Sequence, residues 1–208
     1  MSSPRAYHSS LREEQANQTR LRIRQAAQEL FGAQGFAATT VTEIAKVAGV
    51  SPATIYATFE SKAGIVAAML EAMEEEAGIG AGLETMFAEP DPYVQMRLYV
   101  SLHCTLFATG GDILRAAIQA VETPEVAELM EKGDGNRRAV IDVLTAQWHQ
   151  AGALRGDLSP EAAADRLWLL TTVEGFLNAV DRLGWRPEQY EEWLAGLARA
   201  EVLKSTPT

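Results

Sequence analysis

The chain has 208 residues, 47% of them apolar and 22% charged, with a formal net charge of −10. That many apolar side chains can fill a packed core, which excludes a mainly disordered chain. No apolar run reaches eighteen residues, and the first residues lack a signal-peptide core, so we expect a soluble cytoplasmic protein with no membrane partner. The single cysteine, Cys104, excludes an internal disulfide and a multi-cysteine metal site.

The charge is unevenly distributed along the chain. Residues 1–64 carry seven Lys and Arg against five Asp and Glu, a net charge of +2, so the remaining residues carry −12. A locally basic first third joined to an acidic remainder indicates one part that contacts a polyanion and another part with a different task. Charge alone also leaves open a chance asymmetry in an acidic protein.

Helix signals dominate the chain, and strand signals are almost absent. Apolar spacing over residues 19–33 predicts a first helix, which the glycines of "GAQGF" end. Two short helices are expected, one over about 41–48 and one over about 52–59. Thr40 is the expected N-cap of the first. A longer helix is expected over about 61–78.

The stretch "AGIGAGLETMFAEPDP" is rich in glycine and proline and predicts a hinge or loop. Beyond it, apolar periodicity predicts five more helices, at about 92–108, 112–121, 124–151, 160–183 and 187–203. Residues 132–136, within "EKGDGNRR", form either a loop or a helix kink. The expected fold class is all-α.

The stretch "VAGVSPATIYATFESK" has the features of a helix-turn-helix. Gly49 can adopt the left-handed conformation that closes a tight turn. Ser51 is an N-cap, and Pro52 suits the first helical position, where no amide hydrogen is needed. Ile55 and Phe59, four residues apart, are expected to face the core.

The helix before this turn supplies the surface on which the second helix packs. Ile44 and Val47 are expected to form its apolar side. Ala45 and Ala48 are small, so a second helix can cross close by, and Val50 fills the angle between the two helices. The pair of helices is thus expected to pack as one compact motif.

The remaining side chains of the second helix are small or carry hydroxyl groups. In a helix-turn-helix this helix lies in the major groove, where hydroxyls bond bases or phosphates and methyl groups touch thymine. The N-terminal ends of the neighbouring helices offer further donors to phosphate. The predicted DNA-binding residues are Thr40, Thr42, Ser51, Pro52, Ala53, Thr54, Tyr56, Ala57, Thr58 and Lys62.

The run "ELFGAQGFAATTVTEIAKVAGVSPATIYATFESKAGIVAAML" resembles the DNA-binding domain of the TetR/AcrR family of bacterial transcriptional regulators. Its Leu-Phe and Gly-Phe pairs, threonine-rich cap, "IAKVAGVS", Tyr-x-x-Phe and Ser-Lys follow the family pattern, which covers residues 19–70. Two positions depart from it. Ala53 stands where the family often has Gly, and Thr58 where it often has His, which weakens the phosphate contact expected at Thr58.

The resemblance implies a DNA-binding domain over 18–64, with its helix-turn-helix at 41–60, and a helical effector-binding and dimerisation domain over 65–204. It implies a homodimeric regulator, a repressor released from double-stranded operator DNA by a small, largely apolar effector. It also implies that some of three arginines touch DNA, although solvated surface arginines are an equal alternative. They are Arg20, Arg22 and Arg24.

In this family the last two long helices pair with their symmetry mates in a four-helix bundle. In this chain both helices are apolar on more than one side, which indicates a partner surface. The residues expected at the dimer interface are Leu167, Leu170, Leu177, Tyr190, Trp193, Leu194 and Leu197.

Met and aromatic residues of the acidic part suit an adaptable cavity, although such residues more often form plain core. His103 is likewise more often a core histidine than a ligand. Glu174 and Asn178, four residues apart in an apolar helix, are stronger candidates because burying them unpaired is costly. Pairing of Glu174 across a dimer is also open. The candidate pocket residues are Met69, Met73, Met96, Tyr99, His103, Phe107, Trp148, Trp168, Thr172, Glu174 and Asn178.

Two other classes of protein are less favoured. An enzyme is disfavoured because the sequence has no glycine-rich phosphate loop, Cys/His metal spacing or nucleophile elbow, so we expect no catalytic residues, metal ligands or cofactors. A helical interaction module would use the helix-turn-helix only for packing. The small outward face and the basic first third favour DNA binding over that module.

Overall fold

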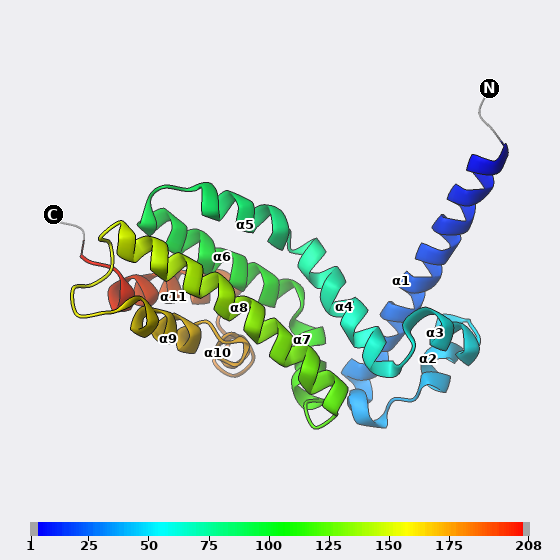
Figure 1. Ribbon diagram of the computed structural model, residues 1–208. Coiled ribbons are helices and arrows are strands. Elements are labelled where there is room, and N and C mark those ends of the chain that lie inside the picture. The colour runs from blue at the N-terminus through cyan, green and yellow to red at the C-terminus, as the bar shows by residue number, and fades with distance from the viewer. Residues whose placement is uncertain (1–3, 206–208) are drawn as a thin grey trace. The chain divides into compact units, whose positions relative to one another are not determined.

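The structure, a computed structural model, describes residues 4–205 (Figure 1). Within these residues no β-strand forms, and the only bridge pairs Leu154 with Leu203, so the predicted all-α fold is confirmed. The chain divides into two compact units. One comprises the residues up to 71 together with 115–128, and the other comprises 72–114 and the residues from 129 on. In the described part of the chain, no helix is both long and apolar enough to span a membrane.

Eleven α-helices and one π-helical segment make up the described residues. They are α1 (Pro4–Ala38), α2 (Val41–Ala48), α3 (Pro52–Phe59), α4 (Lys62–Glu76), α5 (Ile79–Ala88), α6 (Pro92–Thr109), α7 (Gly111–Gln119), α8 (Pro124–Gln150), α9 (Pro160–Leu170), α10 (Val173–Leu177), η1 (Asn178–Arg182) and α11 (Pro187–Val202).

In the first unit, α1 is the longest element, and α2 packs against it (Figure 1). Its apolar stripe buries Ile23, Ala27 and Phe31, as the sequence periodicity predicts. The helix begins about four turns before the predicted start. That difference arises because residues 12–18 are exposed and carry no apolar stripe. Its regular geometry breaks at Gly35, whose φ of 82° belongs to a conformation that favours glycine.

In the second unit, α6 occupies the centre, in contact with α5, α10 and α11 (Figure 1). It buries Met96, Tyr99 and Val100, as expected for a helix that is apolar nearly all round. Gln95 is also buried, but its amide is satisfied. Its Oε1 accepts from Nε1 of Trp148 at 2.7 Å, and its Nε2 donates to a backbone carbonyl of α5 at 3.3 Å.

The segment predicted as a hinge or loop contains α5, so that prediction is wrong. Gly78, at φ 66°, lies between α4 and α5 and forms the turn that ends one helix and begins the next. Gly82 has another purpose, since a side chain there would collide with Leu102 of α6. The glycine allows α5 and α6 to approach closely, and Met86 of α5 is fully buried. The glycines therefore mark close packing as well as a turn.

Two further helix predictions, for residues 132–136 and for 160–183, differ from the structure. Residues 132–136 lie within the continuous helix α8, so the loop alternative is wrong. The helix predicted over 160–183 is interrupted at Thr171, where α9 ends, and Thr172 caps α10 by accepting from the amide of Gly175 at 3.2 Å. Consecutive threonines favour such a break, because their hydroxyls bond nearby backbone groups.

Candidate nucleic-acid interface

The first turn of α2 is fixed by a capping box between Thr40 and Glu43. The Thr40 hydroxyl accepts from the Glu43 amide at 3.2 Å, while the Glu43 carboxylate accepts from the Thr40 amide at 2.8 Å. These hydrogen bonds lower the pKa of Glu43. The Thr40 hydroxyl also lies 2.8 Å from the Glu43 carboxylate, so its hydrogen is engaged within the protein, whereas Thr42 is exposed.

The turn between α2 and α3 has the predicted geometry. Gly49 is left-handed, at φ 66° and ψ 37°, and the Val50 amide donates to the carbonyl of Ala45 at 3.0 Å. Ser51 caps α3 by accepting from the Thr54 amide at 3.1 Å. The structure thus confirms the turn and both caps, which were predicted from neighbouring residues alone.

One prediction for α2 is wrong. Ile44, Ala45 and Ala48 are buried, but Val47 is 50% exposed. The three buried residues lie on one side of the helix, and Val47 lies beside that stripe.

The α3 helix separates its two faces as predicted. Ile55 and Phe59 are buried, whereas Pro52, Ala53, Tyr56 and Ala57 are exposed. The two threonines of α3 lie between these faces. The Thr58 hydroxyl donates to the carbonyl of Thr54 at 2.7 Å, and the Thr54 hydroxyl lies 2.8 Å from that of Ser51. The outward face is therefore small and mostly apolar.

Lys62, at the start of α4, is bound within the protein. Its ammonium donates to the carbonyls of Phe36 at 2.6 Å and Thr39 at 2.7 Å, and lies 4.1 Å from the Phe36 ring centre. Partial burial lowers its pKa. Two of its three N–H groups thus hold the end of α1, a role that the sequence did not indicate. Ser61 caps α4 by accepting from the amide of Gly64 at 2.9 Å.

The three arginines of α1 differ in their surroundings. Arg24 donates to the carbonyl of Ala68 on α4 at 3.3 Å, and its buried Nε has no partner among the described residues. Arg24 is therefore a packing residue. Arg20 lies over the Phe59 ring at 5.7 Å, and Arg22 is exposed. For these two, DNA contact remains a prediction.

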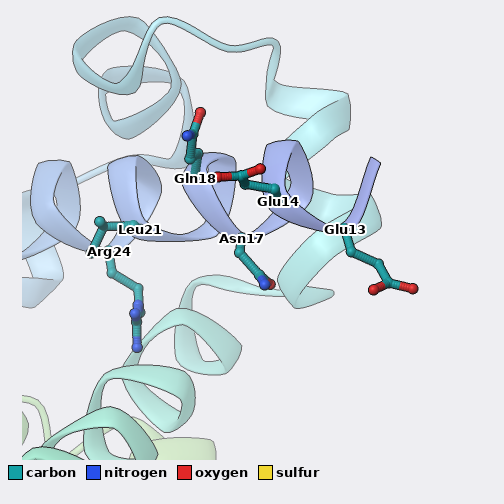
Figure 2. A pocket seen from close by; sticks show the side chains of 6 residues that line it. All are labelled: Glu13, Glu14, Asn17, Gln18, Leu21 and Arg24. Atoms are coloured by element: carbon teal, nitrogen blue, oxygen red, sulfur yellow. The ribbon is translucent and has the colours of Figure 1, made fainter. Parts of the chain in front are cut away.

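An open depression lies along α1, lined by its own side chains (Figure 2). Two of the lining side chains are the carboxylates Glu13 and Glu14, which disfavour a polyanion. The lining residues are Glu13, Glu14, Asn17, Gln18, Leu21 and Arg24.

Comparisons with known proteins agree with this geometry. Residues 23–69 match the family model for bacterial regulatory proteins of the tetR family. The chain is 30% identical over 198 residues to the HTH-type transcriptional regulator TtgR of Pseudomonas putida, across 87% of this chain and 90% of TtgR. This chain belongs to the TetR family. It is a DNA-binding transcriptional regulator, as the resemblance of its sequence implies.

Two solved structures share the fold. NalD, the secondary repressor of the MexAB-OprM multidrug efflux pump in Pseudomonas aeruginosa, matches with a TM-score of 0.74 at 22% identity, covering 93% of this chain and 100% of NalD. SmeT in complex with triclosan matches with a TM-score of 0.73 at 19% identity, covering 89% of this chain and 92% of SmeT. Both confirm the arrangement of TetR-family helices and nothing finer.

Several candidate effector residues gather in the second unit of this TetR-family protein. Tyr99, His103 and Phe107 follow one another along α6 in tilted and edge-to-face contact, with ring centres 4.3 Å and 5.9 Å apart. Burial raises the pKa of Tyr99 to about 12 and lowers that of His103 to about 4, so both are neutral near pH 7. The carbonyl of Tyr99 lies 3.0 Å from Nδ1 of His103, and because a carbonyl only accepts, the ring proton is on Nδ1.

Other candidates are buried or lie at the helix break. Met73, Met96 and Trp148 are buried in the second unit, whereas the buried Met69 belongs to the first unit. Trp168 and Thr172 are half-buried on either side of the break. Their assignment to an effector pocket remains a prediction.

Glu174 and Asn178 are exposed, so the burial expected for them is not found. The interrupted helix explains the difference. Because α9 ends at residue 171, the residues of α10 and η1 do not continue the buried side of α9. Neither residue is a buried polar anchor within one chain.

The polar group that sequence reasoning missed is Arg137 of α8. Its Nη1 donates to the carbonyls of Trp168 at 2.8 Å and Thr171 at 3.0 Å, and its guanidinium lies 5.1 Å from the Trp168 ring centre. The Thr171 hydroxyl donates to the carbonyl of Leu167 at 2.7 Å, so Tyr99 donates its own hydrogen to Thr171 at 3.0 Å. The sequence "NRR" offers no signal for this role.

The residues expected at the dimer interface differ in their exposure within a single chain, and their assignment to an interface remains a prediction. Leu167, Tyr190 and Leu194 are buried within a single chain, where α11 packs on α6 and α9. Leu177 is also buried, whereas Leu170 and Leu197 are half-buried. Trp193 is 48% exposed. Two further leucines in this part of the chain, Leu169 and Leu183, are each 66% exposed.

Proposed function

We propose that this chain is a homodimeric repressor whose two α3 helices bind successive major grooves of an operator and leave it when an effector binds. We also propose a DNA-binding domain over 18–64, with the helix-turn-helix at 41–60, and an effector-binding and dimerisation domain over 65–204. The observation that carries the proposal is the capped, outward-facing α3 behind a left-handed Gly49.

The DNA contacts are supported by exposure and by helix ends. Thr42, Pro52, Ala53, Tyr56 and Ala57 are all exposed, and the second-position amides of α2 and α3, those of Thr42 and Ala53, suit phosphate oxygens. Phosphate contacts set the register of the protein on the duplex, and side chains of α3 read base edges. The chain acts by binding and takes no cofactor.

A homodimer is supported by exposed apolar side chains in the last third of the chain. Leu169, Leu183 and Trp193 expose large apolar surfaces, which a second copy would cover. A two-fold axis places the two recognition helices about 34 Å apart, so the operator is a near-palindrome.

An effector role is supported by the interior of the second unit and by the course of α4. The row of contacting rings formed by Tyr99, His103 and Phe107 suits a small, largely apolar molecule. SmeT, which has this fold, is known in a complex with triclosan. The α4 helix begins at Lys62 in the first unit and ends in the second, so its movement would carry a signal along the chain. Effector and operator must then weaken each other's binding equally.

The experiment is fluorescence anisotropy of the full chain with labelled DNA from upstream of its own gene, at several salt concentrations. We expect nanomolar affinity that exceeds that for a scrambled duplex at least about 1000-fold and falls steeply with salt. Equal affinity for both duplexes, with weak salt dependence, would contradict the proposal. Addition of triclosan and related small phenols then tests release in the same assay.

A further inference from the structure

The recognition helix has an unusual chemical composition. Its eight residues, PATIYATF, include no charged and no amide side chain. In the major groove, Arg and Lys read guanine and Asn and Gln read adenine, each through paired hydrogen bonds. The α3 helix therefore has no side chain for such paired reading of a base edge.

Its hydroxyl groups are largely occupied within the protein. Thr58 donates its only hydroxyl hydrogen to the carbonyl of Thr54 at 2.7 Å. The hydroxyls of Ser51 and Thr54 bond each other at 2.8 Å, which leaves one hydrogen free on the pair. One hydroxyl hydrogen can be donated to an acceptor on any base pair, so it contributes little discrimination between A·T and G·C.

What α3 exposes is apolar except for one phenol. Ala53 and Ala57 are four residues apart and lie on one face of the helix, and the Pro52 ring precedes them. Tyr56 is 53% exposed, and its phenol suits a phosphate, which positions the protein but carries no sequence information. The methyl groups of the two alanines are thus, with the Pro52 ring, the exposed apolar groups of α3 that can contact base edges.

The matching group on DNA is the 5-methyl of thymine, the apolar group that a base pair presents in the major groove. We propose that α3 recognises its half-site through thymine methyl groups packed against Ala53 and Ala57, in place of hydrogen bonds to guanine. This inference rests on the proposed function, namely on α3 lying in the major groove of an operator.

The test begins with a site chosen by the protein itself. The full chain is used to enrich duplexes from a library with a randomised core, and each thymine of the enriched half-site is then replaced by deoxyuridine. This change removes the methyl group and keeps base pairing. Since one buried methyl corresponds to about fourfold in affinity, replacing the contacted thymine in both half-sites should weaken binding about 15-fold.

A protein variant identifies the alanine involved. Ala57→Ser keeps the helix and adds a hydroxyl to the carbon that packs against the thymine methyl, so a polar group enters the apolar contact. With this variant, the loss caused by deoxyuridine at the position facing residue 57 should fall below about twofold, while losses at other positions persist. Ala139→Ser, at an exposed alanine in α8, is the matched control and should retain the full loss.

The possible outcomes separate this inference from the proposed function. Specific binding that deoxyuridine leaves unchanged, and that 7-deazaguanine weakens by removing the guanine N7 acceptor, would overturn the methyl inference and leave the repressor intact. Enrichment of no sequence above background would contradict the proposed function and, with it, this inference. Deoxyuridine sensitivity that Ala57→Ser and Ala53→Ser both leave unchanged would also overturn the inference.

Discussion

At the scale of single residues, Lys62 joins two helices of the first unit. Lys62→Gln removes two charge-assisted hydrogen bonds to the carbonyls of Phe36 and Thr39 and the contact with the Phe36 ring. We expect the free energy of unfolding to fall by about 2 kcal/mol, measured by urea denaturation. Lys46→Gln, on an exposed lysine of α2, should change it by less than about 0.5 kcal/mol.

The same two variants test whether Lys62 also contacts phosphate through its third N–H. If it does, Lys62→Gln reduces the slope of log affinity against log salt by about 1. An unchanged slope with reduced stability would restrict Lys62 to holding α1 and remove it from the DNA-binding set. Loss of neither slope nor stability would contradict the hydrogen bonds described above.

His103 should make stability depend on pH. Its pKa is lowered to about 4 by burial, whereas in the unfolded chain it lies near 6.5. The unfolded state therefore binds more protons between these values, and stability falls as pH falls from about 6.5 to about 4. We expect a loss of about 2–3 kcal/mol from this group, seen as the difference between wild type and His103→Phe in urea denaturation across that pH range. Parallel curves for the two proteins would contradict this assignment.

At the scale of secondary-structure elements, Arg137 stabilises the break between α9 and α10. Arg137→Met leaves the carbonyls of Trp168 and Thr171 without this donor, so we expect unfolding to become easier by about 3 kcal/mol. The neighbouring Arg138→Met removes only exposed ion pairs to Asp142 and Asp165 and should cost under about 1 kcal/mol. Equal losses for both variants, measured by thermal denaturation, would contradict the role of Arg137.

The sequence predicts best the elements whose geometry is set by neighbouring residues. The Thr40 and Ser51 caps, the left-handed Gly49 and the buried pair Ile55 and Phe59 all follow from local patterns. The consecutive threonines favour the break at Thr171, but the arginine that binds the carbonyls there lies on α8, far away in sequence. The same holds for α5, whose glycine at position 82 leaves room for a leucine of α6.

The candidate site divides in the same way. Exposure of α3 could be predicted because an eight-residue amphipathic helix has only two faces. The partners of Lys62 could not be predicted, because its ammonium binds two backbone carbonyls at the end of α1 that lie far away in sequence. Burial of Leu167 and Leu194 within a single chain could not be predicted, because apolar periodicity does not distinguish packing within a chain from packing between chains.

At the scale of the whole molecule, the exposed leucines test the proposed dimer. Leu169→Glu places a charge on a side chain that is 66% exposed, so a single chain should tolerate it within about 0.5 kcal/mol. In a dimer the charge would be buried, and sedimentation should show a shift from dimer to monomer. Val121→Glu, at an exposed valine of the first unit, is the matched control and should leave the oligomer unchanged. If the Leu169→Glu variant formed dimers as tightly as the wild type, Leu169 would lie outside the dimer interface, which would contradict the proposed surface.

The central claim is that two copies of α3 read one operator through the major groove. Hydroxyl-radical footprinting of the full chain on its upstream DNA, or on the enriched site, tests this claim most directly. We expect two protected segments related by two-fold symmetry, with centres about one helical turn apart. Protection of a single segment, or uniform protection without symmetry, would contradict it.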